Sequence, residues 1–476
     1  MQNSSNLIHI ETMGCRLNQI ESEAIANVFL NNNLKVSMQN ITAEYEEDSS
    51  VLLCIVNTCT VTQKSEQKAR RVIRLLLKKF PKALLIITGC YAQLAAKEIE
   101  SIDERICVIG GQIKSRIAKI PELLKIEVQK KTAFNPLDFS EVIKNSILSV
   151  PQVKNGFPEN SFSLSTSSFL SHSRPSLKIQ DGCNNNCSYC AIHFARGHSV
   201  SIDVQTALNR IKELEEKGYS EVVLTSVNIC QYKSEYKGEQ IDFCRLLELF
   251  LENTESICFR ISSIYPQIIT KEFCRIIADK RVRPHFHISV QSGSNKILKL
   301  MNRDYTAEDI VKACNSIRKV KPECFIACDI ITGFPAETDE DFNMTIQLCR
   351  DCNFSWVHAF PFSMRPGTYA CDLKDKVPQS ISGMRAKQVT DLAIENKINY
   401  LSSFVSKQMT AVAEVVRNRA IGGNIYHAVT PNFIHCEIKT TEQLDLTKEI
   451  QIQITGILSE RIKKGGDIEV SAELVK

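Results

Sequence analysis

The first part of the chain alternates short apolar runs with stretches of helical period. Apolar runs at residues 7–10, 51–56 and 84–88 have the length and composition of buried strands. Residues 18–30 and 65–80, which lie between them, repeat apolar side chains at the spacing of amphipathic helices. This order of strand, helix and strand predicts a small parallel α/β domain.

A longer alternation of the same kind follows and predicts a complete or partial (β/α) barrel. Strand-like runs and segments of helical period form repeated strand-then-helix units. The expected strands are residues 221–225, 257–261, 285–290, 324–331 and 355–360, and the expected helices are residues 204–216, 242–251, 271–277, 305–318 and 337–351.

Two changes of pattern mark the expected domain boundaries. Half of residues 161–176 are serine, which is poor material for a packed element and indicates a linker. Beyond about residue 403, short strand-like runs at 410–416, 433–438, 449–454 and 467–472 alternate with glycine-containing turns, which predicts a small β-barrel. The expected parts are an N-terminal domain over residues 1–145, a serine-rich linker over 146–175, a barrel domain over 176–402 and a small β-barrel over 403–476.

Composition narrows the class of protein. The chain has 476 residues, 43% of them hydrophobic and 24% charged, which is enough for two or three packed domains and excludes a disordered protein. No apolar run is long enough to span a membrane, and the N-terminal residues lack the pattern of a signal peptide, so we expect a cytoplasmic protein without a membrane partner. Nineteen cysteines in a reducing compartment would be thiols or metal ligands. The net charge of +4 is too small to indicate nucleic-acid binding alone.

The most specific motif is a set of three cysteines spaced Cys-x3-Cys-x2-Cys at the mouth of the expected barrel. We call Cys183, Cys187 and Cys190 the loop triad. Structural zinc normally has four protein ligands, whereas an iron–sulfur cubane held by three cysteines leaves one iron open to a small molecule. The spacing therefore favours an iron–sulfur cluster over a zinc site or unrelated cysteines.

With Tyr189 directly before its third cysteine, the loop triad resembles the motif of the radical S-adenosylmethionine (SAM) superfamily. The resemblance implies that the three thiols hold a 4Fe-4S cluster whose open iron binds SAM. An electron passed to the SAM sulfonium then releases a 5′-deoxyadenosyl radical, which suits a bond that acid–base catalysis cannot break. Tyr189 would pack beside the cluster.

Polar or glycine-containing turns follow the expected barrel strands, at the ends where barrel enzymes build their sites. Each turn alone is an ordinary βα connection, but their convergence on one face favours a SAM-binding site. The expected SAM-contacting residues are Ser226, Asn228, Ser262, Ser263, Gln291 and Gly333. His285 and His287 share a strand face and are interpreted as hydrogen-bonded interior histidines, and the single Trp356 is interpreted as core.

Three more cysteines follow the three expected N-terminal strands. We call Cys15, Cys59 and Cys90 the N-terminal triad. Parallel strands bring their carboxyl ends to one sheet edge, so these thiols could ligate a second cluster, although buried cysteines are also common core residues.

The sequences around these cysteines resemble the N-terminal domain of the methylthiotransferases. The matching stretches are ETMGCRLNQIESE from residue 11, NTCTVT from 57 and TGCY from 88, followed in the family's order by LTSVN from 224, RISS from 260, VQSGS from 290, MNR from 301, GFPAET from 333 and RPGT from 365. The resemblance implies two 4Fe-4S clusters, the auxiliary one held by the N-terminal triad and carrying the sulfur. It also implies two SAM molecules per product, an electron donor such as a flavodoxin or ferredoxin, and a C-terminal TRAM-like RNA-binding β-barrel.

The stretch around Cys15 resembles most the branch that adds a methylthio group to carbon 2 of threonylcarbamoyladenosine beside the anticodon of tRNA. The alternatives are the branch that acts on isopentenyladenosine and the branch that modifies an aspartate of a ribosomal protein, whose motif usually reads GCPKN where this chain has GCRLN. A non-enzymatic iron–sulfur or zinc RNA-binding protein is the alternative of another class. For the anionic threonylcarbamoyl group, Arg196, Arg260 and Arg365 are candidate contacts.

A basic stripe beginning shortly after Cys59 is either a solvated helix face or a phosphate-binding surface. It consists of Lys64, Lys68, Arg70, Arg71, Arg74, Lys78, Lys79 and Lys82. The chain also departs from the family pattern at His193, His198, Ser226 and Cys230, none of which is an expected cluster ligand. These departures affect only SAM packing and substrate contact.

Overall fold

The structure, a computed structural model, describes residues 7–130, 133–166, 174–420 and 423–475. The chain divides into two compact units, which are described separately. The first comprises Met1–Leu170 with Gln180–Asn185 and Cys190–Ile202, and the second comprises Ser171–Ile179, Asn186–Tyr189 and Asp203–Lys476. Among the described residues, no helix has both the length and the apolar character needed to cross a membrane.

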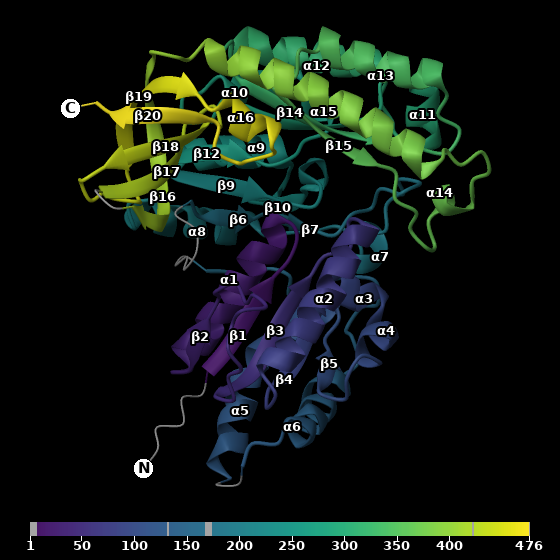
Figure 1. The fold of residues 1–476 in the computed structure, drawn as a ribbon, viewed down its shortest axis with the longest axis vertical. Helices are drawn as coiled ribbons and strands as arrows, with labels where there is room; N and C mark the ends of the chain where they lie inside the picture. Colours follow the sequence, from purple (N-terminus) through teal and green to yellow (C-terminus); the bar gives the residue numbers. More distant parts are fainter. Residues whose placement is uncertain (1–6, 131–132, 167–173, 421–422, 476) are drawn as a thin grey trace. The chain divides into compact units, whose positions relative to one another are not determined.

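The first unit is built on a five-stranded parallel sheet in the order β2-β1-β3-β4-β5 (Figure 1). Its strands are β1 (Leu7–Thr12), β2 (Lys35–Ser37), β3 (Val51–Thr58), β4 (Leu84–Gly89) and β5 (Ile106–Val108). Its helices are α1 (Arg16–Asn31), α2 (Gln63–Lys79), α3 (Cys90–Leu94), α4 (Ala96–Glu100), the 3-10 helix η1 (Gly111–Lys119), α5 (Ile120–Gln129), α6 (Pro136–Ile143), the π-helix η2 (Lys144–Leu148) and α7 (Ile192–Arg196). The parallel α/β domain expected from the sequence is confirmed.

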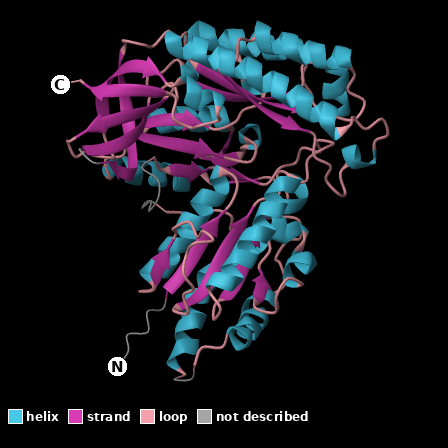
Figure 2. Ribbon diagram, viewed as in Figure 1, coloured by secondary structure: helices cyan, strands magenta, loops and turns pink. Residues whose placement is uncertain are grey.

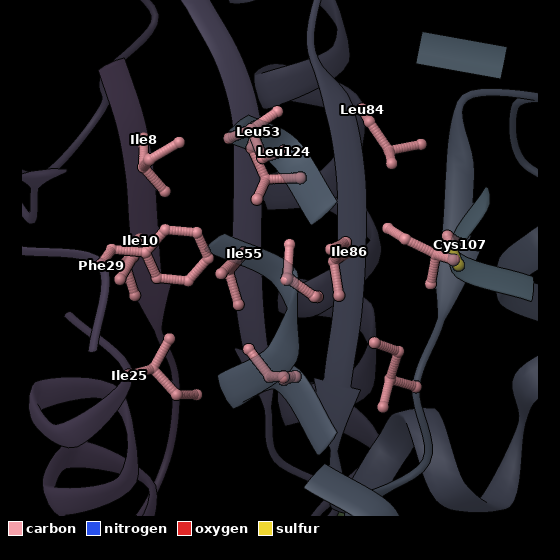
Figure 3. Close-up of a cluster of buried hydrophobic side chains, with 14 of the residues drawn as sticks. Ile8, Ile10, Ile25, Phe29, Leu53, Ile55, Leu84, Ile86, Cys107 and Leu124 are labelled. Carbon is pink, nitrogen blue, oxygen red and sulfur yellow. The ribbon is translucent and has the colours of Figure 1, made fainter. Parts of the chain in front are cut away.

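Apolar side chains cover both faces of this sheet. On one face, Ile10, Ile55 and Ile86 pack against Phe29 of α1 and Leu124 of α5 (Figure 3). A second buried cluster joins the alternate strand residues to α2. Burial on both faces explains why β3 and β4 appear in the sequence as continuous apolar runs and not as alternating ones.

The second unit contains six parallel strands of a partial (β/α) barrel. Two three-stranded sheets, β12-β9-β6 and β13-β14-β15, are joined by a parallel bridge between Ile264 and Ile288. The strands are β6 (Ser176–Lys178), β9 (Glu221–Thr225), β12 (Cys258–Ile261), β13 (His285–Gln291), β14 (Phe325–Thr332) and β15 (Trp356–Pro361). The surrounding helices are α8 (Val204–Glu216), α9 (Phe243–Glu252), α10 (Lys271–Ile277), α11 (Asn295–Leu300), α12 (Ala307–Val320), α13 (Asp339–Asp351), α14 (Tyr369–Asp372) and α15 (Gln379–Ser402), with the 3-10 turns η3 (Ile229–Gln231) and η4 (Pro266–Ile268).

Short hairpins and a closed C-terminal barrel complete the fold (Figure 2). The barrel has the strand order β16-β17-β18-β20-β19 and closes on itself, as expected from the sequence. Its strands are β16 (Gln408–Ala420), β17 (Gly423–Val429), β18 (His435–Thr440), β19 (Glu449–Ile457) and β20 (Val470–Leu474), with α16 (Ser459–Lys463) after β19. The small pairs are β7 (Gln180–Asp181) with β8 (Val200–Ser201), and β10 (Ser234–Tyr236) with β11 (Glu239–Ile241).

A buried ionic cluster, the Glu221 hub, fixes the C-terminal barrel to the partial barrel. Glu221 accepts hydrogen bonds from Arg260 at 2.7 and 2.9 Å and from Arg283 at 2.8 Å. Arg283 also pairs with Glu449 of β19, and Arg260 donates to the Thr430 carbonyl oxygen at 3.2 Å. Burial alone would raise the pKa of Glu221, but the arginines around it lower this pKa to about 2. The hub therefore carries charge at neutral pH and joins both parts of the second unit.

The serine-rich segment is only partly described, because residues 167–173 lie outside the described residues. Before them, Leu164 is buried in the core of the first unit, and Arg116 donates hydrogen bonds to the carbonyl oxygens of Ile147, Val150 and Pro151. Residues 146–166 of the expected linker thus belong to the first unit, whereas residues 174 and 175 belong to the second.

Candidate active site

The N-terminal triad lies at the carboxyl ends of the strands of the five-stranded sheet. Cys59 directly follows β3, Cys90 directly follows β4 as the first residue of α3, and Cys15 is the N-cap residue of α1 after β1. Burial raises the pKa of Cys59 to about 11, and the neighbouring Cys15 and Cys90 thiols also raise it. Gly14, directly before Cys15, lies against the Cys59 side chain, and the strands that precede Cys59 and Cys90 are neighbours in the sheet, as expected for parallel strand ends.

Two glycines allow the cysteine loops to approach each other. Gly14 has a φ of +95°, and a Cβ added there would lie 2.4 Å from the Cβ of Cys59. Gly89 has a φ of +97°, and its added Cβ would lie 2.3 Å from the Thr58 carbonyl oxygen. Asn18 ties the loops together by donating to the carbonyl oxygens of Met13 at 2.8 Å and Thr58 at 3.1 Å. Any side chain at either glycine would displace the Cys59 loop.

A buried group of charges, the Arg196 network, lies beside these thiols. Arg196 donates to Asp181 at 2.8 Å, to Glu21 at 3.2 Å and to the Asn18 side-chain oxygen at 2.9 Å. Lys114 pairs with Glu21, and its ammonium donates to the Asn57 side-chain oxygen at 3.1 Å. All four charged side chains are no more than 7% exposed. Two cations and two carboxylates compensate one another, which makes their burial tolerable.

The same network acts on the thiols. Burial raises the pKa of Cys90, and the positive charges of Arg196 and Lys114 oppose that rise. Arg196 likewise lowers the pKa of Cys59 against the effect of burial. A cation beside a thiol favours its thiolate, which is the form that binds metal. The structure also argues against the expectation that Arg196 contacts the substrate, because its guanidinium is buried and bound to three side chains.

The loop triad is distributed over the two units. Cys183 and Cys190 belong to the first unit and are partly exposed, whereas Cys187 belongs to the second and is buried. Backbone N–H groups donate to two of the sulfurs, from Asn185 to Cys183 at 3.4 Å and from Ile192 to Cys190 at 3.5 Å. Amide donors of this kind stabilise thiolate sulfur and tune iron–sulfur clusters.

Tyr189, two residues after Cys187, lies in an aromatic setting. In the second unit its ring lies 5.6 Å from the buried guanidinium of Arg303, which also lies 4.9 Å from the ring of Tyr265 and 5.8 Å from that of Tyr305. Arg303 further donates a hydrogen bond to the Tyr189 hydroxyl. Arg303, from the MNR stretch, thus fixes the aromatic residue of the cysteine loop.

The chemistry of the thiols fits iron–sulfur clusters. All nineteen cysteines are free thiols in the structure. Within the described residues, no three or more His, Cys, Asp or Glu side chains are arranged to hold a metal ion. Three thiols that follow neighbouring parallel strands, with cations buried beside them, have the ligand chemistry of an iron–sulfur cluster.

The expected SAM-contacting residues all lie at the carboxyl ends of barrel strands. Ser226 follows β9 and Ser262 follows β12, and within the described structure the buried hydroxyl oxygens of both have no hydrogen-bond partner. Buried hydroxyls are normally paired, so two unpaired ones on adjacent strand ends fit a polar ligand such as SAM. Asn228 accepts a hydrogen bond from the Cys230 N–H at 3.2 Å and caps η3.

Two further positions of this set have left-handed backbone conformations. Gln291 ends β13 with a φ of +73°. Gly333 follows β14 with a φ of +68°, and a Cβ added there would lie 1.8 Å from the Ser382 Oγ of α15. Gly333 is therefore required for helix packing, whatever it contacts in the site.

The interior of the partial barrel holds a polar chain that the sequence only partly indicated. His287 bonds Ser263 at 2.8 Å through Nδ1 and lies 3.3 Å from Asp329 through Nε2. His287 is thus a hydrogen-bonded interior histidine, as expected, whereas His285 stacks on Phe433 with ring centroids 4.0 Å apart. Asp329 was missed, although a lone carboxylate within the apolar run of β14 is a usable signal.

Trp356 is not the fully buried core residue that we expected. It is partly exposed at the start of β15, and its indole N–H donates to His358 Nδ1 at 3.2 Å. Arg260 is committed to the Glu221 hub, which argues against a substrate contact, and Arg365 is buried in the turn after β15. The hydrogen-bond partner of Arg260, Glu221, lies 39 positions away in the sequence, so no local pattern could assign this guanidinium.

The basic stripe lies mainly on α2. Lys64, Lys68, Arg71, Arg74 and Lys78 are exposed and form no ion pair with any described residue. Arg70 instead pairs with Glu98 at 3.0 Å. An unpaired cationic face that begins shortly after Cys59 keeps the phosphate-binding interpretation open.

Comparison with known proteins defines the class and then the family. Residues 177–349 match the radical SAM superfamily, and residues 7–111 match the uncharacterized protein family UPF0004. Among solved structures, the radical SAM methyltransferase TsrM from Kitasatospora setae, with cobalamin and a [4Fe-4S] cluster bound, has a TM-score of 0.51 at 13% identity over 77% of this chain and 74% of that chain. Fold and motif together define a radical SAM protein.

The curated relatives narrow the class further. A threonylcarbamoyladenosine tRNA methylthiotransferase MtaB of Treponema pallidum is 42% identical over 86% of this chain and 91% of its own length. The MtaB of Bacillus subtilis is 30% identical over 94% of this chain and 93% of its own length. A tRNA-2-methylthio-N(6)-dimethylallyladenosine synthase of Bacteroides thetaiotaomicron is 31% identical over 87% of this chain and 86% of its own length. The chain belongs to the radical SAM methylthiotransferase family.

Proposed function

We propose that this protein adds a methylthio group to carbon 2 of N6-threonylcarbamoyladenosine next to the anticodon of tRNA. The observation that carries the proposal is the 42% identity, over 91% of its length, to a relative named for that nucleoside. The relative named for the dimethylallyl nucleoside is less similar, at 31%. The C2–H bond is neither acidic nor polarised, which fits a reaction that begins with a carbon radical.

The loop triad would hold the 4Fe-4S cluster that binds SAM, and the N-terminal triad would hold a second, auxiliary cluster. When bound, the clusters and SAM would supply the 5′-deoxyadenosyl radical and the transferred sulfur, with two SAM molecules per product. This chain's own contribution is positioning. Gly14 and Gly89 hold the Cys59 loop, the Arg196 network favours thiolates, and Arg303 orients Tyr189.

Ser226, Asn228, Ser262, Ser263, Gln291 and Gly333 are the proposed SAM-binding set. The unpaired hydroxyls of Ser226 and Ser262 support this assignment, because SAM offers amino, carboxylate and ribose groups as partners. We further assign residues 1–145 to the methylthiotransferase domain, 176–402 to the radical SAM domain and 403–476 to a TRAM-like RNA-binding barrel. The exposed cations of α2 are a proposed contact for tRNA phosphates.

The proposal implies partners and a location. A flavodoxin or ferredoxin would supply the electron, and a cytoplasmic location follows from a tRNA substrate. A nucleotide in the anticodon loop can be unstacked for a few kcal/mol, which would make carbon 2 of its base accessible to the enzyme.

One experiment separates the branches. The anaerobically reconstituted enzyme is incubated with tRNA bearing threonylcarbamoyladenosine and tRNA bearing isopentenyladenosine, together with SAM and a reductant. The tRNA is then digested, and the masses of its nucleosides are measured by mass spectrometry. A mass gain on the threonylcarbamoyl nucleoside alone supports the proposal. A gain on the isopentenyl form alone contradicts the branch assignment, and a gain on a ribosomal protein instead contradicts the tRNA substrate.

A further inference from the structure

A segment of the expected linker is anchored in the first unit. Residues 150–159, which we call the strap, follow η2 and are fixed at both ends by Arg116 of η1. The Arg116 guanidinium donates to the carbonyl oxygens of Val150 at 2.6 Å and Pro151 at 3.1 Å, and to the Glu159 carboxylate at 2.6 and 2.8 Å. The hydrogen bond from Arg116 holds the pKa of Glu159 below its ordinary value, so this anchor is an ion pair at neutral pH.

The middle of the strap packs against the residues that follow α7. The His198 N–H donates to the Gly156 carbonyl oxygen at 2.7 Å, and the Phe157 and His198 rings lie 4.7 Å apart at an interplanar angle of 32°. The Lys154 ammonium lies 3.8 Å from the Phe157 ring centroid. Gly197 permits this approach, because a Cβ added there would lie 2.3 Å from the Gly156 carbonyl oxygen. The contact thus combines a close backbone approach with an aromatic pair.

The same residues after α7 hold the first cysteine of the loop triad. The Cys183 N–H donates to the Gly197 carbonyl oxygen at 2.9 Å, next to the paired strands β7 and β8. The Asn184 side-chain oxygen accepts a hydrogen bond from the Ser199 N–H at 3.0 Å and lies 3.2 Å from His198 Nδ1, within hydrogen-bond distance. His198 therefore contacts the strap and the cysteine loop at once.

We propose that the strap, acting through His198, positions the Cys183 side of the loop triad for cluster binding. The inference rests on the proposed function, in which the loop triad holds the SAM-binding cluster, and adds to it the residues that hold the loop. Cys183 is partly exposed, and exposed loops open locally at a smaller free energy than packed elements do.

The contacts of the strap raise the free energy of this local opening. Movement of Cys183 and Asn184 away from their places disturbs His198, and movement of His198 breaks its stack on Phe157 and its hydrogen bond to Gly156. The ends of the strap cannot follow, because Arg116 ties them to η1. Phe157 and His198 are thus positioning residues that act through the cysteine loop and not through a contact with the cluster.

The test follows iron in two forms of the full-length, anaerobically reconstituted protein. In the first form the N-terminal triad is replaced by alanine, so that only the loop triad holds iron, and in the second form the replacement is reversed. Transfer of iron to an excess of chelator measures local opening of the cysteine loops. Phe157→Ala should speed iron loss from the loop triad by about 2- to 12-fold, the factor that corresponds to one aromatic pair. It should leave iron loss from the N-terminal triad unchanged.

Two variants of the same strap serve as controls. Phe157→Tyr keeps the ring and should keep the wild-type rate of iron loss. Val153→Ala removes a side chain that is 92% exposed and should change neither rate.

The outcomes separate this inference from the proposed function. If Phe157→Ala speeds iron loss from both triads equally, or from neither, the strap does not position the cysteine loop and the inference is wrong. If the first form holds no iron after reconstitution, the cluster assignment of the proposed function fails and the inference fails with it. If the rates change as expected but neither tRNA gains a methylthio group, the inference stands and the proposed substrate is wrong.

Discussion

Replacing Arg196 with methionine should lower the melting temperature of the first unit substantially. Methionine keeps the length and apolar stem of the side chain but removes the cation that faces both Asp181 and Glu21. Lys114 still pairs with Glu21, so Asp181 is the carboxylate left without its cation. The variant thus isolates the electrostatic part of the Arg196 network.

The size of the effect follows from burial. Removing one partner of a buried ion pair costs about 3–5 kcal/mol, because the other charge stays desolvated and uncompensated. For a unit of about 150–250 residues, each kcal/mol lowers the melting temperature by about 2–4 °C, so the expected fall is about 6–20 °C. The matched control is Lys144→Met, which breaks an exposed pair of the same unit, with exposures of 48% and 62%, and should shift the melting temperature by less than about 4 °C.

Thermal unfolding of the anaerobic apoprotein, followed by circular dichroism, measures both variants. A second replacement, Arg196→Met with Asp181→Asn, should recover part of the loss because it removes the uncompensated carboxylate. If Arg196→Met melts within the range of Lys144→Met, the network does not stabilise the unit and the argument is refuted.

Three further predictions concern the hub, the cysteine loops and the clusters. The folded-state pKa of Glu221 is about 2, below its ordinary 4.5, so its contribution to the free energy of unfolding is complete above pH 4.5 and is lost as the pH falls toward 2. In urea unfolding across this window, Glu221→Gln should lose less stability than the wild type. An equal loss of stability in both proteins would count against the hub. Gly14→Ala should displace Cys59 and reduce the iron content from about eight to about four atoms per chain. The control Gly218→Ala, at a φ of +81° with open space around it, should keep the full iron content. An unchanged iron content in Gly14→Ala would show that the loop tolerates a side chain. Alanine at all three cysteines of the loop triad should stop 5′-deoxyadenosine formation, and alanine at the N-terminal triad should abolish methylthio transfer while some SAM cleavage continues; the converse pattern would reverse the two assignments.

Strong periodicity made the main elements predictable from the sequence. The runs at 51–56 and 84–88 correspond to β3 and β4, which extend only two and one residues further. The three-residue strands β2 and β5 were not predicted, because they are too short to show a period and are defined by pairing with β1 and β4. In the C-terminal barrel, β17 was missed because its sequence, GNIYHAV, mixes polar and apolar residues without a clear alternation.

The site was predictable where chemistry is local and not where it depends on tertiary partners. Cysteine spacing and strand ends were enough to nominate both triads. Arg196 was a candidate substrate contact because the threonylcarbamoyl group is anionic, and no sequence pattern links it to its partner Glu21, 175 positions away. Trp356 was assigned to the core because large aromatic residues are mostly buried, whereas at the start of β15 it is partly exposed and lies against the Lys397 ammonium.

Mass spectrometry of tRNA nucleosides from cells that lack this protein tests the central proposal most directly. We expect the 2-methylthio form of threonylcarbamoyladenosine to disappear and its unmethylthiolated precursor to accumulate, while the isopentenyladenosine derivatives stay unchanged. Wild-type protein supplied in trans should restore the product, and the alanine variants of either triad should not. If the product persists in the deletion strain, or only the isopentenyl derivative is lost, the proposed function is wrong.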